Sequence, residues 1–149
     1  MRAVVQRVKR SNVSVDGNVI GQIGPGFTVL LGISTEDTEK DLQYIEDKIA
    51  GLRLFDDENG VMNVSLEDAR GEVLLVSQFT LYGDARKGRR PSYIHAQKGE
   101  AAKVLYETLR DRLRQRGLRV DTGEFGAEME VTIVNDGPVT ILLDSTKLF

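Results

Sequence analysis

The chain has 149 residues, of which 40% are hydrophobic, and this length and composition predict one domain, residues 1–149, with a sizeable core. It has no cysteine, which excludes disulfides, thiolate nucleophiles and cysteine-ligated metals, and its one histidine gives no imidazole set for zinc, so we expect no metal and no cofactor. The net charge of -3 argues against a surface generally adapted to nucleic acid, and the lack of a signal-peptide core or long apolar run predicts a cytoplasmic protein with no membrane partner.

The first segment predicts a β-meander. Residues 2–9 alternate around valines, and two further apolar segments flank Asp16 and Gly17, a pair suited to a two-residue hairpin turn. The sequence at 24–26, Gly-Pro-Gly, predicts a second turn, of type II. The nearly all-apolar segment 27–33 then predicts a central strand.

The next segment predicts an amphipathic helix over residues 39–51. Thr38 and Asp41 have the spacing of a capping box, and the apolar residues that follow recur at helical spacing: Leu42, Ile45, Ile49 and Leu52. After it we expect an extended segment at 52–55, a turn at 56–60 and an irregular connection over 61–71 in which Ser65 caps a short turn.

The rest of the chain is organised around residues 71–82, GEVLLVSQFTLY. Four apolar residues at 73–76 predict a strand buried on both faces, and polar side chains follow at its end: Ser77, Gln78 and Thr80, with Phe79 between them. Polar groups at the mouth of a buried strand cost free energy unless protein, water or ligand satisfies them. This strand end is therefore a candidate ligand site.

The second half predicts one more helix and three strands. Residues 83–93 read as a loop, and a helix is expected over 98–116 because Gly117 suits its C-terminus and one face is apolar, with Val104, Leu105, Leu109 and Leu113. Strands follow at 118–123, 130–134 and 139–144, separated by a loop at 123–129 and a turn at 135–138. Two main helices among about eight strands predict an α+β fold with mainly antiparallel pairing.

Charge is unevenly distributed. Between Arg86 and Arg119 there are eleven basic residues and three acidic ones, whereas acidic residues concentrate at 36–47 and 56–68. A surface polarised in this way could guide an anionic polymer, but the simpler interpretation, which we favour on charge alone, is a solvated arginine-rich helix.

The familiar catalytic patterns are missing. His95 lies in a polar stretch at a helix entrance and is expected at the surface, and no carboxylate pair ends an apolar strand. The sequence has no nucleophile elbow, phosphate-binding loop or dinucleotide motif. On physical grounds alone the segment 135–140, NDGPVT, is an ordinary hairpin turn.

Several segments in order nevertheless resemble one family. SQFTLY at 77–82, RRPS at 89–92, GEFGAEM at 123–129 and NDGPVT at 135–140, with QRV at 6–8 and the turn at 24–26, are similar to the D-aminoacyl-tRNA (D-tyrosyl-tRNA) deacylase family. The resemblance covers essentially the whole chain. This chain departs from the family's usual small residues and proline before the second helix, where it has Tyr93, Ile94, His95, Gln97 and Lys98.

The resemblance implies a barrel-like core and an enzyme that hydrolyses the ester between a D-amino acid, or glycine mischarged on tRNA-Ala, and the 3′ ribose of tRNA. It implies a homodimer with active sites at the subunit interface, each built from one chain's Ser77–Thr80 segment and the other chain's Gly137 and Pro138. In the family that Gly-Pro bond is cis, so both carbonyl oxygens face the substrate α-carbon and exclude an L side chain. Arg7 and Asn135 are implied as supporting residues.

Two mechanisms remain open. The N–H groups of Phe79 and Thr80 could stabilise the oxyanion, with Ser77 and Gln78 positioning the substrate and Phe125 stacking on the terminal adenine. Attack could come from the Thr80 hydroxyl or from a water oriented by the tRNA 2′-OH; we favour the second, because no base accompanies Thr80 in its motif.

Two other functional classes are compatible with the composition. A non-catalytic RNA-binding barrel would use the arginine-rich helix and bind with a steep salt dependence. A small-molecule ester hydrolase would use Thr80 and cleave simple D-amino acid esters.

Overall fold

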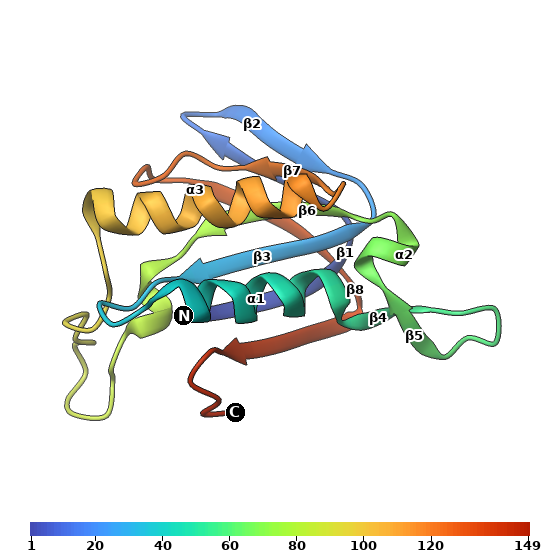
Figure 1. Ribbon diagram of the computed structural model, residues 1–149. Coiled ribbons are helices and arrows are strands. Elements are labelled where there is room, and N and C mark those ends of the chain that lie inside the picture. The colour runs from blue at the N-terminus through green and yellow to red at the C-terminus, as the bar shows by residue number, and fades with distance from the viewer.

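The computed structural model describes residues 1–149 and contains eight strands, three α-helices and one 3-10 turn (Figure 1). In chain order the elements are β1 (Arg2–Val15), β2 (Asn18–Ile23), β3 (Gly26–Gly32), α1 (Glu39–Gly51), β4 (Arg53–Asp56), β5 (Met62–Ser65), α2 (Leu66–Ala69), β6 (Glu72–Ser77), η1 (Phe79–Tyr82), α3 (Gly99–Gln115), β7 (Arg119–Thr122) and β8 (Glu130–Asp144). No helix is long and apolar enough to cross a membrane.

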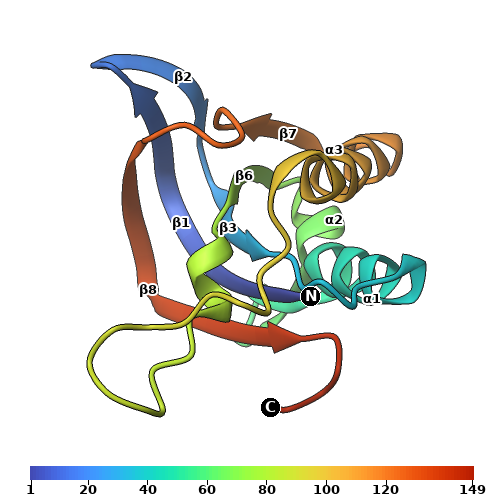
Figure 2. The ribbon, with the colours of Figure 1, turned by 90° about the vertical axis from the view of Figure 1, so that its left-hand side faces the viewer.

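Strand β1 organises the main sheet because it is fourteen residues long and pairs along both edges. β2 and β3 follow one another along one edge, with Ile23 opposite Ser11 and Gly26 opposite Val8, and β8 runs along the other edge. β6 and β7 extend the sheet from β3 in parallel pairings. The Gln22 N–H of β2 donates to the Asp121 carboxylate of β7 at 2.9 Å, so the sheet curls into a nearly closed barrel (Figure 2).

This topology confirms the α+β class and the antiparallel majority but corrects two expected connections. The predicted meander is wrong, because β3 continues β2 along β1 and Gly24-Pro25 is a bend between them. The predicted turn at 135–138 is also wrong: β8 continues through it, with Asn135 opposite Val8 and Thr140 opposite Gln6. Both bends lie opposite the same part of β1, where its pairing register shifts, so they curve the sheet instead of reversing the chain.

Local signals predicted the helices well. The Asp41 carboxylate accepts the Thr38 N–H at 2.8 Å, completing the expected capping box of α1. The connection over 61–71 is more regular than expected, because β5 pairs with β4 and Ser65 caps the one-turn helix α2. On α3 the prediction that Val104 faces the core is wrong: Val104 is 54% exposed, and Tyr106 is buried in its place.

The core lies between the sheet and the helices α1 and α3, which lie side by side on one face (Figure 1). Residues on alternate positions of β6 enter two clusters: Val73 and Leu75 pack under the helices, and Leu74 and Val76 pack on the other face. Each fully buried aliphatic side chain contributes roughly 1.5–3 kcal/mol. The prediction that this strand is buried on both faces is therefore confirmed.

Candidate active site

The site begins where β6 ends. β6 stops at Ser77, the first of the polar residues expected at the end of this strand; the Gln78 N–H still donates to the Leu31 carbonyl at 2.7 Å, and the chain then turns into η1. η1 packs against Gly32 of β3, where a Cβ atom would lie only 2.9 Å from the Leu81 side chain. This close approach fixes the direction in which the polar corner leaves the sheet.

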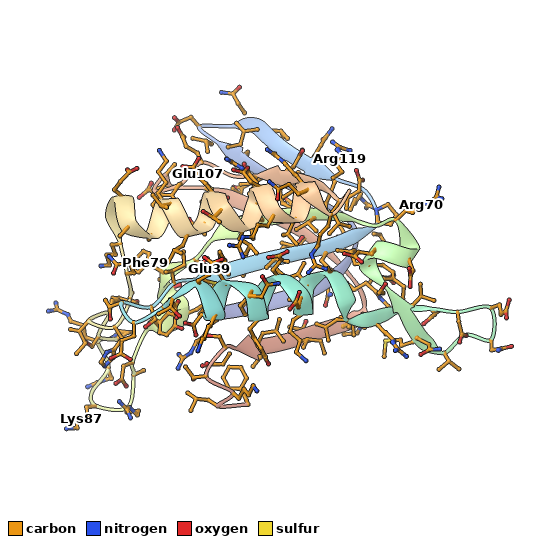
Figure 3. All side chains as sticks on the ribbon, in the orientation of Figure 1. Glu39, Arg70, Phe79, Lys87, Glu107 and Arg119 are labelled. Carbon is orange, nitrogen blue, oxygen red and sulfur yellow. The ribbon has the colours of Figure 1, made fainter.

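The corner is partly exposed, as the sequence predicted. Ser77 and Gln78 are half-buried, Thr80 is exposed, and Phe79 is 43% exposed. Figure 3 shows the place of Phe79 on the ribbon. The amide Nε2 of Gln78 donates to the Thr80 hydroxyl at 2.5 Å. The N–H groups of Phe79 and Thr80 occupy the first positions of η1, where helical N–H groups have no intrahelical partner, and no side chain caps them.

A cavity of about 200 Å³ opens beside this corner. The ends of β3 and β6, the start of α3 and the loop 123–129 form it, with the lining residues Leu31, Ile33, Ser77, Phe79, Gln97, Lys98, Gly99, Ala102, Phe125 and Gly126. Phe125 also packs against Tyr106, with ring centroids 5.6 Å apart. The fold thus brings Phe125 to the same cavity as Ser77 and Phe79, which the sequence could suggest only by resemblance.

Two residues at the rim were not predicted as site residues. Tyr93 contacts the Phe79 ring edge to face, with centroids 5.2 Å apart, and the Lys98 ammonium lies 4.7 Å above the Phe79 ring. Only their place between the RRPS segment and the second helix could have drawn attention to them. Together they give the cavity an aromatic rim with a positive charge, which suits a nucleobase and its phosphate.

The corner contains no general base. No carboxylate or imidazole lines the cavity. His95 is exposed, as predicted, and lies beside Asp84 and Arg86 in a different cavity. The group beside the Thr80 hydroxyl is an amide that donates a hydrogen bond, so it cannot accept the hydroxyl proton.

A larger cavity, of about 530 Å³, lies on the other side of Tyr82, and its carboxylates have structural roles. Asp144 accepts hydrogen bonds from the Arg2 guanidinium and Thr146, and Asp37 accepts from the Met1 amine and the Ser34 N–H. Burial alone would raise the pKa of Asp144, but these hydrogen bonds outweigh it and the pKa lies below its ordinary value. These groups hold chain segments together.

The bend in β8 is held by two side chains. Arg7, whose side chain is 12% exposed, donates from Nη1 to the Leu54 carbonyl at 2.6 Å and from Nε to the Asp136 carbonyl at 3.2 Å. Asn135 donates from Nδ2 to the carbonyls of Arg7 and Val139, at 2.9 and 3.0 Å. The Gly137-Pro138 bond between these anchors is cis, and both residues are exposed.

In a single chain, the cavity beside Ser77 and Phe79 and the cis Gly137-Pro138 bend are therefore separate from each other. Neither Gly137 nor Pro138 lines the cavity beside Ser77 and Phe79. Since β8 pairs only with β1, the other edge of β8 has no partner strand. Leu142, a residue of β8, is 56% exposed. A long open edge strand is unusual in a monomer and typical of a surface that meets another chain.

Fold and corner together define the class of protein: a barrel-like α+β domain with a polar corner at the end of its central strand, beside a small apolar cavity. Residues 4–144 match the family described as D-Tyr-tRNA(Tyr) deacylase. The chain belongs to this family.

Similar proteins agree over the whole length. Proteins named D-aminoacyl-tRNA deacylase from Clostridium beijerinckii and Clostridium kluyveri are 63% and 60% identical over 149 residues, with 100% of each chain covered. The solved structure of c-Myc DNA Unwinding Element Binding Protein has a TM-score of 0.91 and 47% identity, over 97% of this chain and 98% of that one. A probable eukaryotic D-amino acid tRNA deacylase, at 18% identity and a TM-score of 0.82, covering 95% and 97%, shares the fold.

Proposed function

We propose that the protein hydrolyses the ester that joins a D-amino acid to the 3′-terminal ribose of tRNA, releasing free D-amino acid and tRNA. The observation that carries the proposal is a polar corner with two available N–H donors beside a small apolar cavity, in a chain 63% identical over its full length to a D-aminoacyl-tRNA deacylase. Its place of action would be the cytoplasm, where tRNA is charged.

The cavity suits the end of the RNA. In the proposed complex the terminal adenine stacks on Phe125, inside a cavity with five hydrophobic lining residues. The ester carbonyl then faces the N–H groups of Phe79 and Thr80, each worth about 3 kcal/mol to a developing oxyanion. Ser77 and Gln78 orient the ribose and the ester.

Hydrolysis in this site is assisted by the substrate. A water held by the ribose 2′-OH attacks the carbonyl, the oxyanion forms against the two N–H groups, and collapse expels the 3′ oxygen, which takes up the proton. This route is favoured because the Thr80 hydroxyl has a hydrogen-bond donor beside it and no base. The protein contributes orientation and electrostatic stabilisation, and the RNA contributes the hydroxyl.

Chirality is selected by a second subunit. In the proposed homodimer the exposed Gly137-Pro138 main chain of the partner subunit stands over the corner, and its carbonyl oxygens leave no room for an L side chain. The hydrogen bonds from Arg7 and Asn135 keep this main chain rigid, which exclusion by shape requires. Such a barrier ignores side-chain identity, so many D-amino acids and glycine on tRNA-Ala are accepted.

The two rival classes have less support. Two arginines on and next to α3 are engaged by acidic residues of the same protein, which weakens the case for an RNA-binding helix: Arg112 pairs with Glu39 and Glu46, and Arg116, at the C-terminal cap, pairs with Glu46, Asp47 and Glu67. A general esterase would need a base beside Thr80, and the hydrogen-bond partner of the Thr80 hydroxyl is instead the Gln78 amide, a donor.

The test compares three substrates on one tRNA: the D-aminoacyl ester, the L-aminoacyl ester, and the D-aminoacyl ester on a terminal 2′-deoxyribose. We expect fast hydrolysis of the first only. Equal cleavage of both enantiomers would refute chiral selection, and unimpaired hydrolysis of the 2′-deoxy substrate would refute substrate assistance. No cleavage of any aminoacyl-tRNA would refute the function itself.

A further inference from the structure

The loop 83–93, here called the basic loop, carries a cluster of four basic residues, three of which have no partner in the protein. Four of the five residues at 86–90 are basic. Arg86 is held by Asp84 through two hydrogen bonds of 2.9 and 2.7 Å, whereas Lys87, Arg89 and Arg90 are exposed and make no ion pair or hydrogen bond. They contrast with Arg112 of α3 and Arg116 at its C-terminal cap, which are paired.

The basic loop has a defined shape and touches the active-site corner. Asp84 and Ser92 exchange backbone hydrogen bonds of 2.8 and 2.9 Å across its base, and Tyr93 contacts Phe79. The loop borders a cavity of about 530 Å³ whose lining includes Arg86, Lys87 and Arg90. The base of the loop thus adjoins Phe79 of the pocket proposed for the terminal nucleotide, and its cations line a separate cavity farther out.

The opposite rim of the pocket carries the other sign of charge. The loop 123–129 holds Glu124 and Glu128, both exposed and without an ion pair. Figures 1 and 2 show this loop and the basic loop on opposite sides of η1. A polyanion that leaves the pocket is repelled on the first side and attracted on the second.

We propose that the basic loop binds backbone phosphates of the RNA strand next to the terminal nucleotide, with Lys87, Arg89 and Arg90 as the contacts. The proposal rests on the proposed function, since it takes the terminal nucleotide to occupy the pocket beside Phe79. A cavity of about 200 Å³ holds one nucleoside at most, so the rest of the tRNA lies outside it. Phosphate contacts of this kind position the RNA without reading its sequence.

The test uses two variants that each remove one lysine and two arginines. The loop variant combines Lys87→Gln, Arg89→Gln and Arg90→Gln, and the control combines Lys48→Gln, Arg53→Gln and Arg70→Gln. Figure 3 shows Lys87 and Arg70 at opposite ends of the molecule. Each variant is assayed on D-aminoacyl-tRNA at several salt concentrations and on the D-aminoacyl ester of adenosine, which has no phosphate.

With tRNA we expect KM of the loop variant to rise about tenfold. The slope of log KM against log salt concentration should fall by about 0.7 for each lost phosphate contact, or by about two for the three contacts together. With the adenosine ester we expect the loop variant and wild type to agree within about twofold. A loop variant that matches the control on tRNA overturns the proposal. Equal losses on both substrates also overturn it, because the loop would then act by supporting Phe79.

Failure of the proposed function can be distinguished from failure of the proposal for the basic loop. If wild type cleaves neither substrate, the function is wrong, and binding of uncharged tRNA still tests the loop. The loop variant must then bind more weakly than the control, with the shallower salt dependence; equal binding overturns the proposal.

Discussion

At the scale of single residues, the chemistry depends on what stands beside each polar atom. The Thr80 hydroxyl accepts a hydrogen bond from the Gln78 amide at 2.5 Å and has no hydrogen bond to a carboxylate or an imidazole. A hydroxyl without a base is a weak nucleophile, so its exposed position does not make it catalytic. The neighbouring N–H groups need no activation.

Substitution of Thr80 separates the two mechanisms. For Thr80→Ala we expect kcat on D-aminoacyl-tRNA to fall less than about tenfold, because the N–H groups remain. Thr80→Ser is the matched control. If serine retained activity while alanine lost about a thousandfold or more, the hydroxyl would be the nucleophile and substrate assistance would be wrong.

Arg7 is one of the two side chains that hold the β8 bend. Arg7→Met leaves the carbonyls of Leu54 and Asp136 without their donor, which should cost about 2 kcal/mol of stability. We expect the ratio of D- to L-aminoacyl-tRNA hydrolysis to fall about tenfold, since a looser barrier excludes less. Arg10→Met, at an exposed position on the same strand, is the control. An unchanged ratio in folded Arg7→Met protein would contradict this role.

At the scale of elements, ion pairs join α1 to α3. Glu46 is 6% exposed and accepts from Arg116 at 2.8 Å and from Arg112 at 3.5 Å, and this carboxylate makes the α1–α3 surface a structural interface. Glu46→Gln should therefore lower the free energy of unfolding by about 2 kcal/mol in urea titrations, because two partly buried guanidinium groups lose their counter-charge. Asp111→Asn, which removes an exposed partner of Arg110, should cost under about 0.5 kcal/mol. Equal effects of the two substitutions would contradict the role of burial.

Asp144 joins the start of β1 to the end of β8 and gives stability a pH dependence. Its pKa lies below the ordinary 3.8, because hydrogen bonds from Thr146 and Arg2 outweigh its burial. A carboxyl with a lowered pKa in the folded state stabilises the protein above pH 3.8, and this contribution is lost as pH falls through the folded-state value.

Unfolding of wild type and Asp144→Asn at pH 7 and at pH 3 measures this contribution. The asparagine variant should be less stable at pH 7, and the difference in stability should narrow at pH 3, because below pH 3.8 the unfolded chain binds a proton that folded Asp144, with its lowered pKa, binds less readily. A gap that stays constant over this range would show that Asp144 acts through its shape and not through its charge.

At the scale of the whole molecule, the proposed site needs two copies of the chain. Thr80→Arg and Gly137→Arg each place a long side chain in the site, from the corner and from the barrier, so each homodimer should be inactive. In mixed dimers, one of the two sites combines an intact corner with an intact barrier. Random mixing should therefore restore about a quarter of wild-type activity.

Native mass spectrometry supplies the control for mixing, because it shows whether heterodimers have formed. Heterodimers that form without regaining activity would mean that the site is not shared between subunits. A chain that stays monomeric at assay concentration would refute the dimer itself.

The sequence alone determined the features that depend on neighbouring residues. The capping box at Thr38, the hairpin turn at Asp16 and Gly17 and the buried character of residues 73–76 all follow from short-range chemistry, and the structure confirms them. The polar end of the central strand was visible for the same reason.

Only the tertiary structure decided which segments meet. The bends at Gly24-Pro25 and at 135–138 resemble chain reversals locally, and they are bends because β1 is long enough to pair on both sides of each. Ion pairs connect Arg116 with Glu46 of α1, although the two residues lie far apart in the sequence. The residues around the cavity, Phe125, Tyr93 and Lys98, also come from distant segments. Such contacts depend on the path of the whole chain, because the residues on either side of each group do not fix its distant partner.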